Sequence, residues 1–316
     1  MSCVYVIADQ YMDTISDHTL AVIEAARSMA MPIVLLVAGD LSESTLVQFQ
    51  THTDLIKIVR FLHPTLNERM PEWLAPVLCE YIQREPGYVL MAANTYGKNL
   101  LPRLSALLDL EMVSNVCDIS WPLVSHDIYA GNIIERVVLG DSPICMSIQA
   151  SAFVVPPSKQ AGHIVVEVID ALPDVMPDYT ARVTNIPACD EAAPRLDNAA
   201  CVIAGGRALG SEANFVRLGS VAAKIGAAMG GTRAAVDSGY IANHHQIGQT
   251  GQTIAPETYI AFGISGAIQH VAGITAGRTI IAVNTDPGAE IFQVADYGLV
   301  GDWLEVVTAL EQQVGK

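Results

Sequence analysis

The sequence is poor in the features that mark several classes of protein. Only 16% of its 316 residues are charged, and 17 Lys and Arg face 33 Asp and Glu, so the formal net charge is −16. So acidic a chain is not expected to bind nucleic acid or an anionic membrane, since both require clustered basic residues. No run of about 18 apolar residues is present, which predicts no membrane insertion. The start of the chain has no basic leader, which predicts a cytoplasmic protein.

Short-range metal-ligand and disulfide motifs are also missing. The six cysteines are widely scattered without a CxxC pair, and the eight histidines include no HExxH. These spacings argue against a zinc site, an iron–sulfur cluster and a disulfide framework. We therefore predict no metal site.

What the chain does contain is apolar residues, which make up 51% of it and exclude a disordered protein. The length suggests two domains. In the first half, apolar runs alternate with segments of helical periodicity, which is typical of parallel βαβ units. The runs span residues 4–8, 33–38 and 87–92, and the helical segments span 19–29, 71–83 and 100–108. Shorter β-rich pieces between about 113 and 168 predict some antiparallel strands.

A stretch rich in Pro and acidic residues, 170–198, predicts a connection between domains. A new pattern begins at Cys201 with a strand, and a helix is predicted over 215–229. We therefore expect an α/β protein of two domains. Residues 1–190 would form an N-terminal α/β domain with a mainly parallel sheet, and residues 191–316 a C-terminal Rossmann-like α/β domain.

Several strands of the C-terminal part run into glycine-containing turns. They include Gly205-Gly206-Arg207, Gly263-Ile264-Ser265-Gly266 and the loop 248–251. In parallel sheets, ligands bind outside the carboxyl ends of strands, where small residues admit a phosphate. One such turn is more often only a tight turn, but several in one sheet favour a nucleotide cofactor. The nicotinamide fingerprint GxGxxG is absent after the first strand.

These turns belong to longer motifs, and together they resemble the electron transfer flavoprotein alpha subunit. The motifs are Gly205-Gly206-Arg207, residues 231–239, residues 246–251 and the segment 259–270, which contains Gly-Ile-Ser-Gly-Ala-Ile-Gln-His. The resemblance extends into the first half at 96–103 and 129–132, so it covers nearly the whole chain. Two departures are Thr232, where the family commonly has Ser, and Gln252, where Lys is common.

The resemblance implies a non-covalent FAD in the C-terminal domain, while the N-terminal domain contacts a partner subunit. It implies that Arg233 and His270 lie near the isoalloxazine ring, where a fixed cation or donor raises the potential and favours the anionic semiquinone. It implies that Thr250 faces flavin N5. Positions that line the ribityl and pyrophosphate groups are Arg207, Thr232, Ile247, Gly248, Gln249, Ser265, Gly266, Ala267, Ile268 and Gln269. Asn284 and Asp302 match positions at the ribityl–adenosine end.

Some of these residues also have simpler explanations. Arg233 would pair with Asp237, four residues on, if that segment were helical, but the Val-Asp-Ser-Gly turn argues against a helix. His270 would be a core histidine, Asn284 a turn residue, and Asp302 an N-cap before Trp303. Lys98 and Asn99 are expected to begin a helix rather than to bind phosphate.

The leading functional interpretation is an electron carrier rather than an enzyme with its own substrate. The resemblance implies the alpha subunit of a heterodimer, in which AMP on the beta subunit would indicate simple electron transfer and a second FAD would indicate electron bifurcation. It would accept electrons from flavoprotein dehydrogenases, such as acyl-CoA dehydrogenases, and pass them to the membrane-bound electron transfer flavoprotein–quinone oxidoreductase. The alternatives are a subunit of an electron-bifurcating complex that oxidises NADH, and a regulatory nucleotide-binding module without redox activity.

Overall fold

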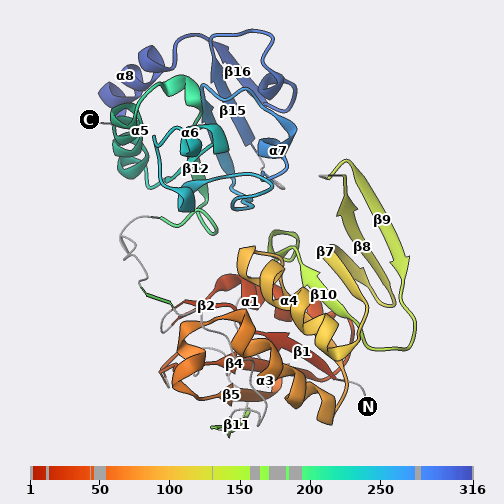
Figure 1. The fold of residues 1–316 in the computed structure, drawn as a ribbon. Helices are drawn as coiled ribbons and strands as arrows, with labels where there is room; N and C mark the ends of the chain where they lie inside the picture. Colours follow the sequence, from red (N-terminus) through yellow and green to blue (C-terminus); the bar gives the residue numbers. More distant parts are fainter. Residues whose placement is uncertain are drawn as a thin grey trace. The chain divides into compact units, whose positions relative to one another are not determined.

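The computed structural model describes residues 3–11, 14–42, 44–45, 55–129, 131–156, 164–170, 183–184, 194–274 and 279–314. The chain divides into two compact units, unit 1 (Met1–Ile186) and unit 2 (Pro187–Lys316) (Figure 1). The boundary predicted between residues 190 and 191 lies outside the described residues, as does most of the predicted connection 170–198.

Unit 1 is built on a sheet of nine described strands in the order β11-β5-β4-β1-β6-β10-β7-β8-β9. The strands from β11 to β7 pair in parallel, whereas β7, β8 and β9 pair antiparallel. Their bounds are β1 Val4–Ile7, β4 Ile33–Ala38, β5 Leu55–Phe61, β6 Tyr88–Ala92, β7 Met112–Ser120, β8 Leu123–Ile128, β9 Ile133–Val138, β10 Cys145–Ile148 and β11 Val165–Ile169. The prediction of a mainly parallel sheet with an antiparallel end is confirmed.

The other elements of unit 1 whose bounds are described are short strands β2 (Gln10–Tyr11) and β3 (Thr14–Ile15), helices α1 (Asp17–Arg27), α3 (Pro71–Arg84) and α4 (Thr95–Leu108), and 3₁₀ turns at Pro64–Glu68 and Ala150–Ala152. Local signals start these helices. The Ser16 hydroxyl accepts a bond from the His18 amide, Pro71 occupies the first turn of α3, and Asn94 caps α4. Lys98 and Asn99 were expected to begin a helix; they lie within its first two turns, and α4 begins earlier, at Thr95 after the Asn94 cap.

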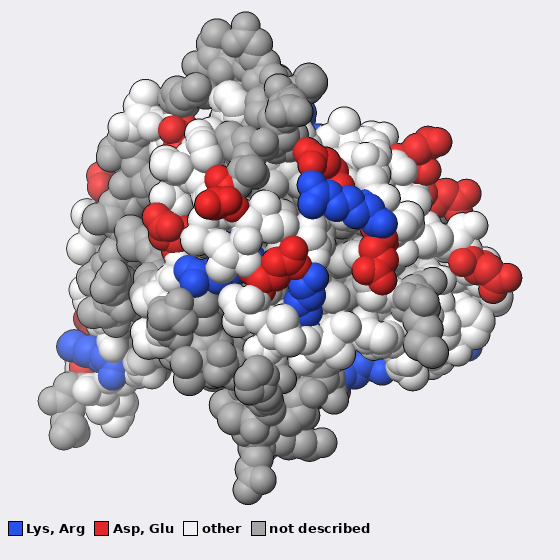
Figure 2. Space-filling view, turned by 90° about the horizontal axis from the view of Figure 1, so that it is seen from below, with Lys and Arg blue, Asp and Glu red and all other residues white. Residues whose placement is uncertain are grey.

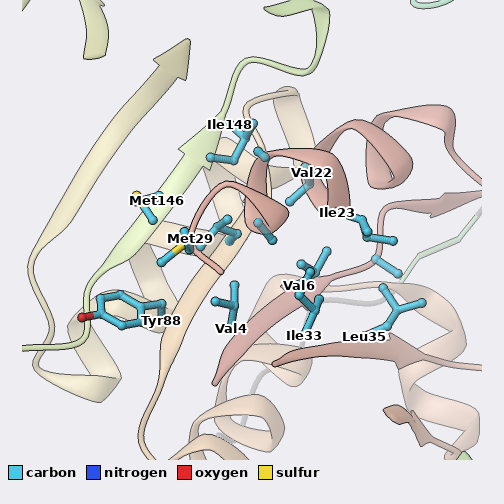
Figure 3. Packing of buried hydrophobic residues seen from close by; sticks show 14 of the residues in the cluster. Val4, Val6, Val22, Ile23, Met29, Ile33, Leu35, Tyr88, Met146 and Ile148 are labelled. Carbon is cyan, nitrogen blue, oxygen red and sulfur yellow. The ribbon is translucent and has the colours of Figure 1, made fainter. Parts of the chain in front are cut away.

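The core of unit 1 lies on both faces of its sheet, which explains the uninterrupted apolar run of β1. Val4 and Val6 pack with α1 residues such as Val22 and Ile23, as Figure 3 shows. Tyr5 and Ile7, whose side chains alternate to the opposite face, pack with residues of α3 and α4. A strand buried on both faces needs apolar residues at every position, as parallel sheets generally do.

Unit 2 contains a second sheet, of five described strands in the order β13-β12-β14-β15-β16, all parallel. The strands are β12 Cys201–Gly205, β13 Ala228–Gly231, β14 Thr258–Phe262, β15 Thr279–Asn284 and β16 Tyr297–Val300. The helices are α5 Glu212–Lys224, α6 Arg233–Asp237, α7 Ile268–Val271 and α8 Trp303–Val314, with 3₁₀ turns at Arg207–Leu209, Asn243–His245 and Glu290–Gln293. Apolar clusters cover both faces of this sheet as well.

One predicted element of unit 2 is wrong at its end. The helix expected over 215–229 ends at Lys224, and residues 228–229 belong to β13. The chain turns at Gly226, whose φ of +68° lies in the left-handed region that glycine adopts most readily. The Ala-rich composition on both sides of this glycine hid the change from helix to strand.

Charged side chains are dispersed over the described surface. Figure 2 shows basic residues scattered among acidic ones on one face, with no large basic area among the described residues there. Described ion pairs include Arg69–Asp9 at 3.1 Å and Arg103–Glu72 at 3.0 Å. In the part of the chain that the structure describes, no helix is long and apolar enough to cross a membrane.

Candidate functional site

The carboxyl ends of β12 and β14 lie where the strand order of unit 2 reverses. The chain passes from β12 to β13 on one side and then returns to β14 on the other. At such a point the loops that follow neighbouring strands diverge and leave a crevice, where parallel α/β sheets bind ligands. A cavity of about 1010 Å³ lies there. This volume is at the upper end of the range of roughly 300–1,000 Å³ that small-molecule sites occupy, so the cavity is large enough for an extended ligand.

Two glycines that line this cavity, Gly206 and Gly263, lie where the ends of β12 and β14 approach each other closely. A Cβ on Gly206, which follows β12, would lie 1.9 Å from the carbonyl oxygen of Gly263, which follows β14. No side chain fits between two backbones so close, so only glycine permits this approach. The sequence motifs therefore place glycine where the two strand ends meet.

Most of the residues predicted for the site line this one cavity. They come from the turn after β12, from α6 and its cap, from the loop 246–252, from the turn after β14, from α7 and from the end of β15. The predicted residues in the lining are Arg207, Thr232, Arg233, Ile247, Gly248, Gln249, Thr250, Ser265, Ala267, Gln269, His270 and Asn284. Segments nearly eighty residues apart in the sequence thus meet at one edge of the sheet.

Three predicted residues are not among the described residues that line the cavity. Gly266 has a φ of +89°, and a Cβ there would lie 2.1 Å from the amide nitrogen of Ile291, so its role is close packing. Ile268 begins α7 and is exposed. Asp302 accepts a bond from the Leu304 amide at 2.9 Å and thereby caps α8, as its alternative explanation anticipated.

Asn284 is a turn residue after β15, as its simpler explanation expects. Its side-chain amide donates to the Ile264 carbonyl at 2.9 Å, and its side-chain oxygen accepts from the Asp286 amide at 3.0 Å. The first bond ties the end of β15 to the turn after β14, and the second begins the turn that follows. Asn284 also lines the cavity.

Among the described residues that line the cavity, the charged ones are Arg207, Arg233, Asp237, Asp286 and Glu290. Contrary to expectation, residues 233–237 form a helix, α6, capped by Thr232, and Arg233 Nε lies 3.5 Å from Asp237 Oδ2. The Thr232 hydroxyl starts this short helix by accepting from the Ala235 amide, an effect that the turn-like sequence concealed. Both side chains are about two-thirds exposed, so the pair is weak and either partner can turn to a ligand.

His270 lines the cavity, yet its ring is held from behind by the protein. Nδ1 donates to the Ile247 carbonyl at 3.1 Å, and because a carbonyl only accepts, Nε2 must accept from the Tyr259 hydroxyl, 2.7 Å away. Burial lowers the pKa of His270 to about 4, although its bond to Ile247 opposes this shift. His270 is therefore neutral at neutral pH, and in this arrangement Arg233 and Arg207 are the cations of the cavity.

The loop 246–252 carries a further contact to the cavity. Gln246 is buried, and its side-chain amide nitrogen donates to the Thr250 hydroxyl oxygen at 3.0 Å. Burial also raises the pKa of Tyr259, which lies behind His270, so its hydroxyl stays protonated. Behind the cavity, the described polar groups thus form fixed donor–acceptor pairs.

Several lining residues were not predicted. Gln246 stands in a quoted motif, but its contact with Thr250 runs across an irregular loop, where no periodicity reveals it. Asp237 was considered only as a partner of Arg233. Asp286, Gly288, Ala289 and Glu290 follow the end of β15, and the rule that ligands gather at the carboxyl ends of strands would have found them.

The residues of the cavity fit the FAD that the sequence resemblance implies. FAD is long, flat and doubly phosphorylated, so its site must be extended and must let phosphate approach the backbone. The volume, the bare backbone at Gly206 and Gly263, and two available arginines meet these needs. Thr250, Gln249 and Ser265 add side chains able to hydrogen bond to a ligand.

Comparisons with known proteins identify the family of this chain. The family model "Electron transfer flavoprotein FAD-binding domain" matches residues 195–275, and the model "Electron transfer flavoprotein domain" matches residues 4–174. The chain is 36% identical to the electron transfer flavoprotein subunit alpha of Pseudomonas aeruginosa over 98% of this chain and 99% of that protein. It is 39% identical to a probable mitochondrial subunit alpha from Schizosaccharomyces pombe, over 95% of this chain and 88% of the other. With the mitochondrial subunit alpha of Arabidopsis thaliana it shares 37% identity over 98% and 88%.

Proposed function

The chain belongs to the electron transfer flavoprotein subunit alpha family and FAD is its cofactor, and from this premise we propose that it is the FAD-carrying half of a heterodimeric electron carrier. It takes electrons from flavoprotein dehydrogenases, such as acyl-CoA dehydrogenases, and delivers them to a membrane-bound quinone oxidoreductase. It is a carrier and has no organic substrate of its own.

The observation that carries this proposal is the cavity at the ends of β12 and β14. The cavity brings Arg207, Arg233, Thr250 and His270 together around one space of about 1010 Å³. FAD bound there supplies the chemistry, since a flavin takes up and gives up electrons one or two at a time, while the protein sets its position and potential.

Within this proposal the cavity residues have different tasks. Arg207, beside the bare backbone of Gly206, holds the phosphates, and Arg233 lies beside the ring, where negative charge develops. The Thr250 hydroxyl faces N5. His270 acts as a neutral wall, since both of its ring nitrogens bond to the protein.

Exposed apolar residues at the edges of the two sheets support the proposal that the chain binds a partner subunit. All four residues of the edge strand β16 are exposed, among them Tyr297, Leu299 and Val300, and so are Ile133 and Ile134 of the edge strand β9. Permanent interfaces are the more apolar kind, so we assign these edges to the heterodimer. The five described free thiols suit a reducing compartment, and we place the protein in the cytoplasm.

Co-expression of the chain with its beta subunit tests the proposal. The purified complex is denatured with acid, and the released nucleotides are separated by chromatography. We expect one FAD per complex and AMP from the partner, and reduction of the flavin by an acyl-CoA dehydrogenase with its substrate. A complex without FAD, or one that no flavoprotein dehydrogenase reduces, would refute the proposal. A second FAD in place of AMP would indicate electron bifurcation instead.

A further inference from the structure

The loop 246–252 is fixed by the backbone on both sides. The Gln252 amide donates to the Gln246 carbonyl at 2.7 Å and the Gly248 amide to the Gln252 carbonyl at 3.1 Å, which closes the loop on itself. The Ile247 amide donates to the Gly231 carbonyl at 2.9 Å, which anchors the loop to the end of β13. Thr250 therefore has a defined place at the cavity, and contacts to its side chain have a defined direction.

Within this loop, the hydrogen bond from the Gln246 side-chain amide to the Thr250 hydroxyl oxygen determines the direction in which the Thr250 hydroxyl hydrogen points. Gln246 is only 6% exposed, and its amide nitrogen, which can only donate, lies 3.0 Å from Thr250 Oγ1. Thr250 is exposed at the cavity, and its oxygen uses one lone pair to accept this bond. Its single hydrogen stays free for the cavity, so Thr250 acts as a donor to whatever lies there.

We propose that Gln246 is a positioning residue that keeps Thr250 a hydrogen-bond donor and so selects the protonation state of the bound flavin. This inference rests on the proposed function, because it takes Thr250 to face N5. Flavin N5 is an acceptor as long as it carries no hydrogen. Uptake of two electrons and one proton at N5 makes it an N–H donor, which then faces another donor. Gln246 thus favours a one-electron-reduced flavin whose N5 carries no hydrogen over a flavin that is fully reduced.

Substitutions at Gln246 test the direction of its hydrogen bond to Thr250. In Gln246→Glu the carboxylate only accepts, so it takes the Thr250 hydrogen and leaves only lone pairs for the flavin. Gln246→Leu removes the amide without burying a charge. Gln252→Glu is the matched control, because it adds the same charge to the same loop, while the Gln252 side chain bonds to the His244 carbonyl and is not among the described residues that line the cavity.

The measurement is a reductive titration of the flavin-loaded complex, which gives the fraction of flavin that is one-electron reduced at the midpoint. One net hydrogen bond contributes about 0.5–1.5 kcal/mol. We therefore expect a roughly two- to tenfold fall in the stability of the one-electron level in Gln246→Glu. The fall should be smaller in Gln246→Leu, and Gln252→Glu should behave as wild type. In a Thr250→Val background, which has no hydroxyl, the substitutions at Gln246 should lose this effect.

A flavin-free readout separates this inference from the proposed function. In the flavin-free full chain, Thr250→Val should shift the NMR signal of the Gln246 side-chain amide, whereas Gln252→Glu should leave it in place. An unmoved signal would overturn the contact itself. Equal effects of Gln246→Glu and Gln252→Glu, or an effect that persists in full without the Thr250 hydroxyl, would overturn the positioning role. A chain that shows the amide shift but binds no FAD would refute only the proposed function.

Discussion

The buried, neutral state of His270 makes the stability of unit 2 depend on pH. Its pKa is about 4 in the folded protein and about 6.5 in an unfolded chain. Above pH 6.5 the ring is neutral in both states and contributes nothing to the difference. As the pH falls below 6.5, His270 becomes protonated in the unfolded chain, whereas in the folded protein it stays neutral until about pH 4. Stability is therefore lost over this window as the pH falls.

The expected magnitude follows from the two pKa values. From pH 7.5 to pH 5.5 the unfolding free energy should fall by about 1.4 kcal/mol through His270 alone, and by about 3 kcal/mol once the pH lies below both values. The first interval is the useful one, because carboxylates stay largely ionised above pH 5. His270→Asn removes the titration but keeps an amide able to donate to the Ile247 carbonyl.

Urea unfolding of the chain at equal flavin content, followed by NMR of 5-fluorotryptophan, measures this effect. Trp303 reports on unit 2, whereas the other two tryptophans lie in unit 1. Between pH 7.5 and 5.5 the wild type should lose about 1.4 kcal/mol more than His270→Asn. A surface change in the same unit, Asn243→Ala, should keep the wild-type dependence. Equal pH dependence in the wild type and His270→Asn would refute a neutral, buried His270.

Three other changes should have measurable effects. Tyr259→Phe leaves the buried Nε2 of His270 without a donor and should lower the unfolding free energy by about 1–3 kcal/mol in urea titrations. Gly206→Ala forces a Cβ against a backbone carbonyl, so it should lower the unfolding free energy by about 1–3 kcal/mol and cause loss of the bound flavin. Gly219→Ala, in an open position of α5, should instead raise the unfolding free energy by about 0.4–1 kcal/mol. Arg233→Ala should lower the flavin potential in a redox titration, because the free energy of reduction becomes less favourable by on the order of 1 kcal/mol or more. Arg207→Ala should lower the potential less.

Each of these expectations has an outcome that contradicts it. Unchanged stability of Tyr259→Phe would mean that its hydroxyl has another partner. A flavin-replete Gly206→Ala chain as stable as wild type would mean that the two strand ends do not meet closely. Equal potentials in Arg233→Ala and wild type would remove Arg233 from the ring.

Local patterns in the sequence were enough to predict the two α/β parts, the parallel strands and the family. Strands buried on both faces and amphipathic helices leave local periodic patterns, and caps and Pro71 leave local signals at helix starts. The glycine-containing motifs are short contiguous stretches of sequence, because glycine is needed at the few positions where the backbone makes a close approach. These features are local in the chain, so one sequence suffices to find them.

Which side chains face each other depends on how distant segments of the chain pack together. The two hydrogen bonds of the His270 ring join it to residues 11 and 23 positions away in the sequence, and each partner lies in another element or loop. The pairing of Gln246 with Thr250 depends on how an irregular loop closes, and the pairing of Arg233 with Asp237 depends on a helix that one threonine cap starts. Burial, and with it the pKa of His270, arises only when β14, α7 and this loop pack together, because desolvation depends on the whole surroundings of a group and not on its neighbours in sequence.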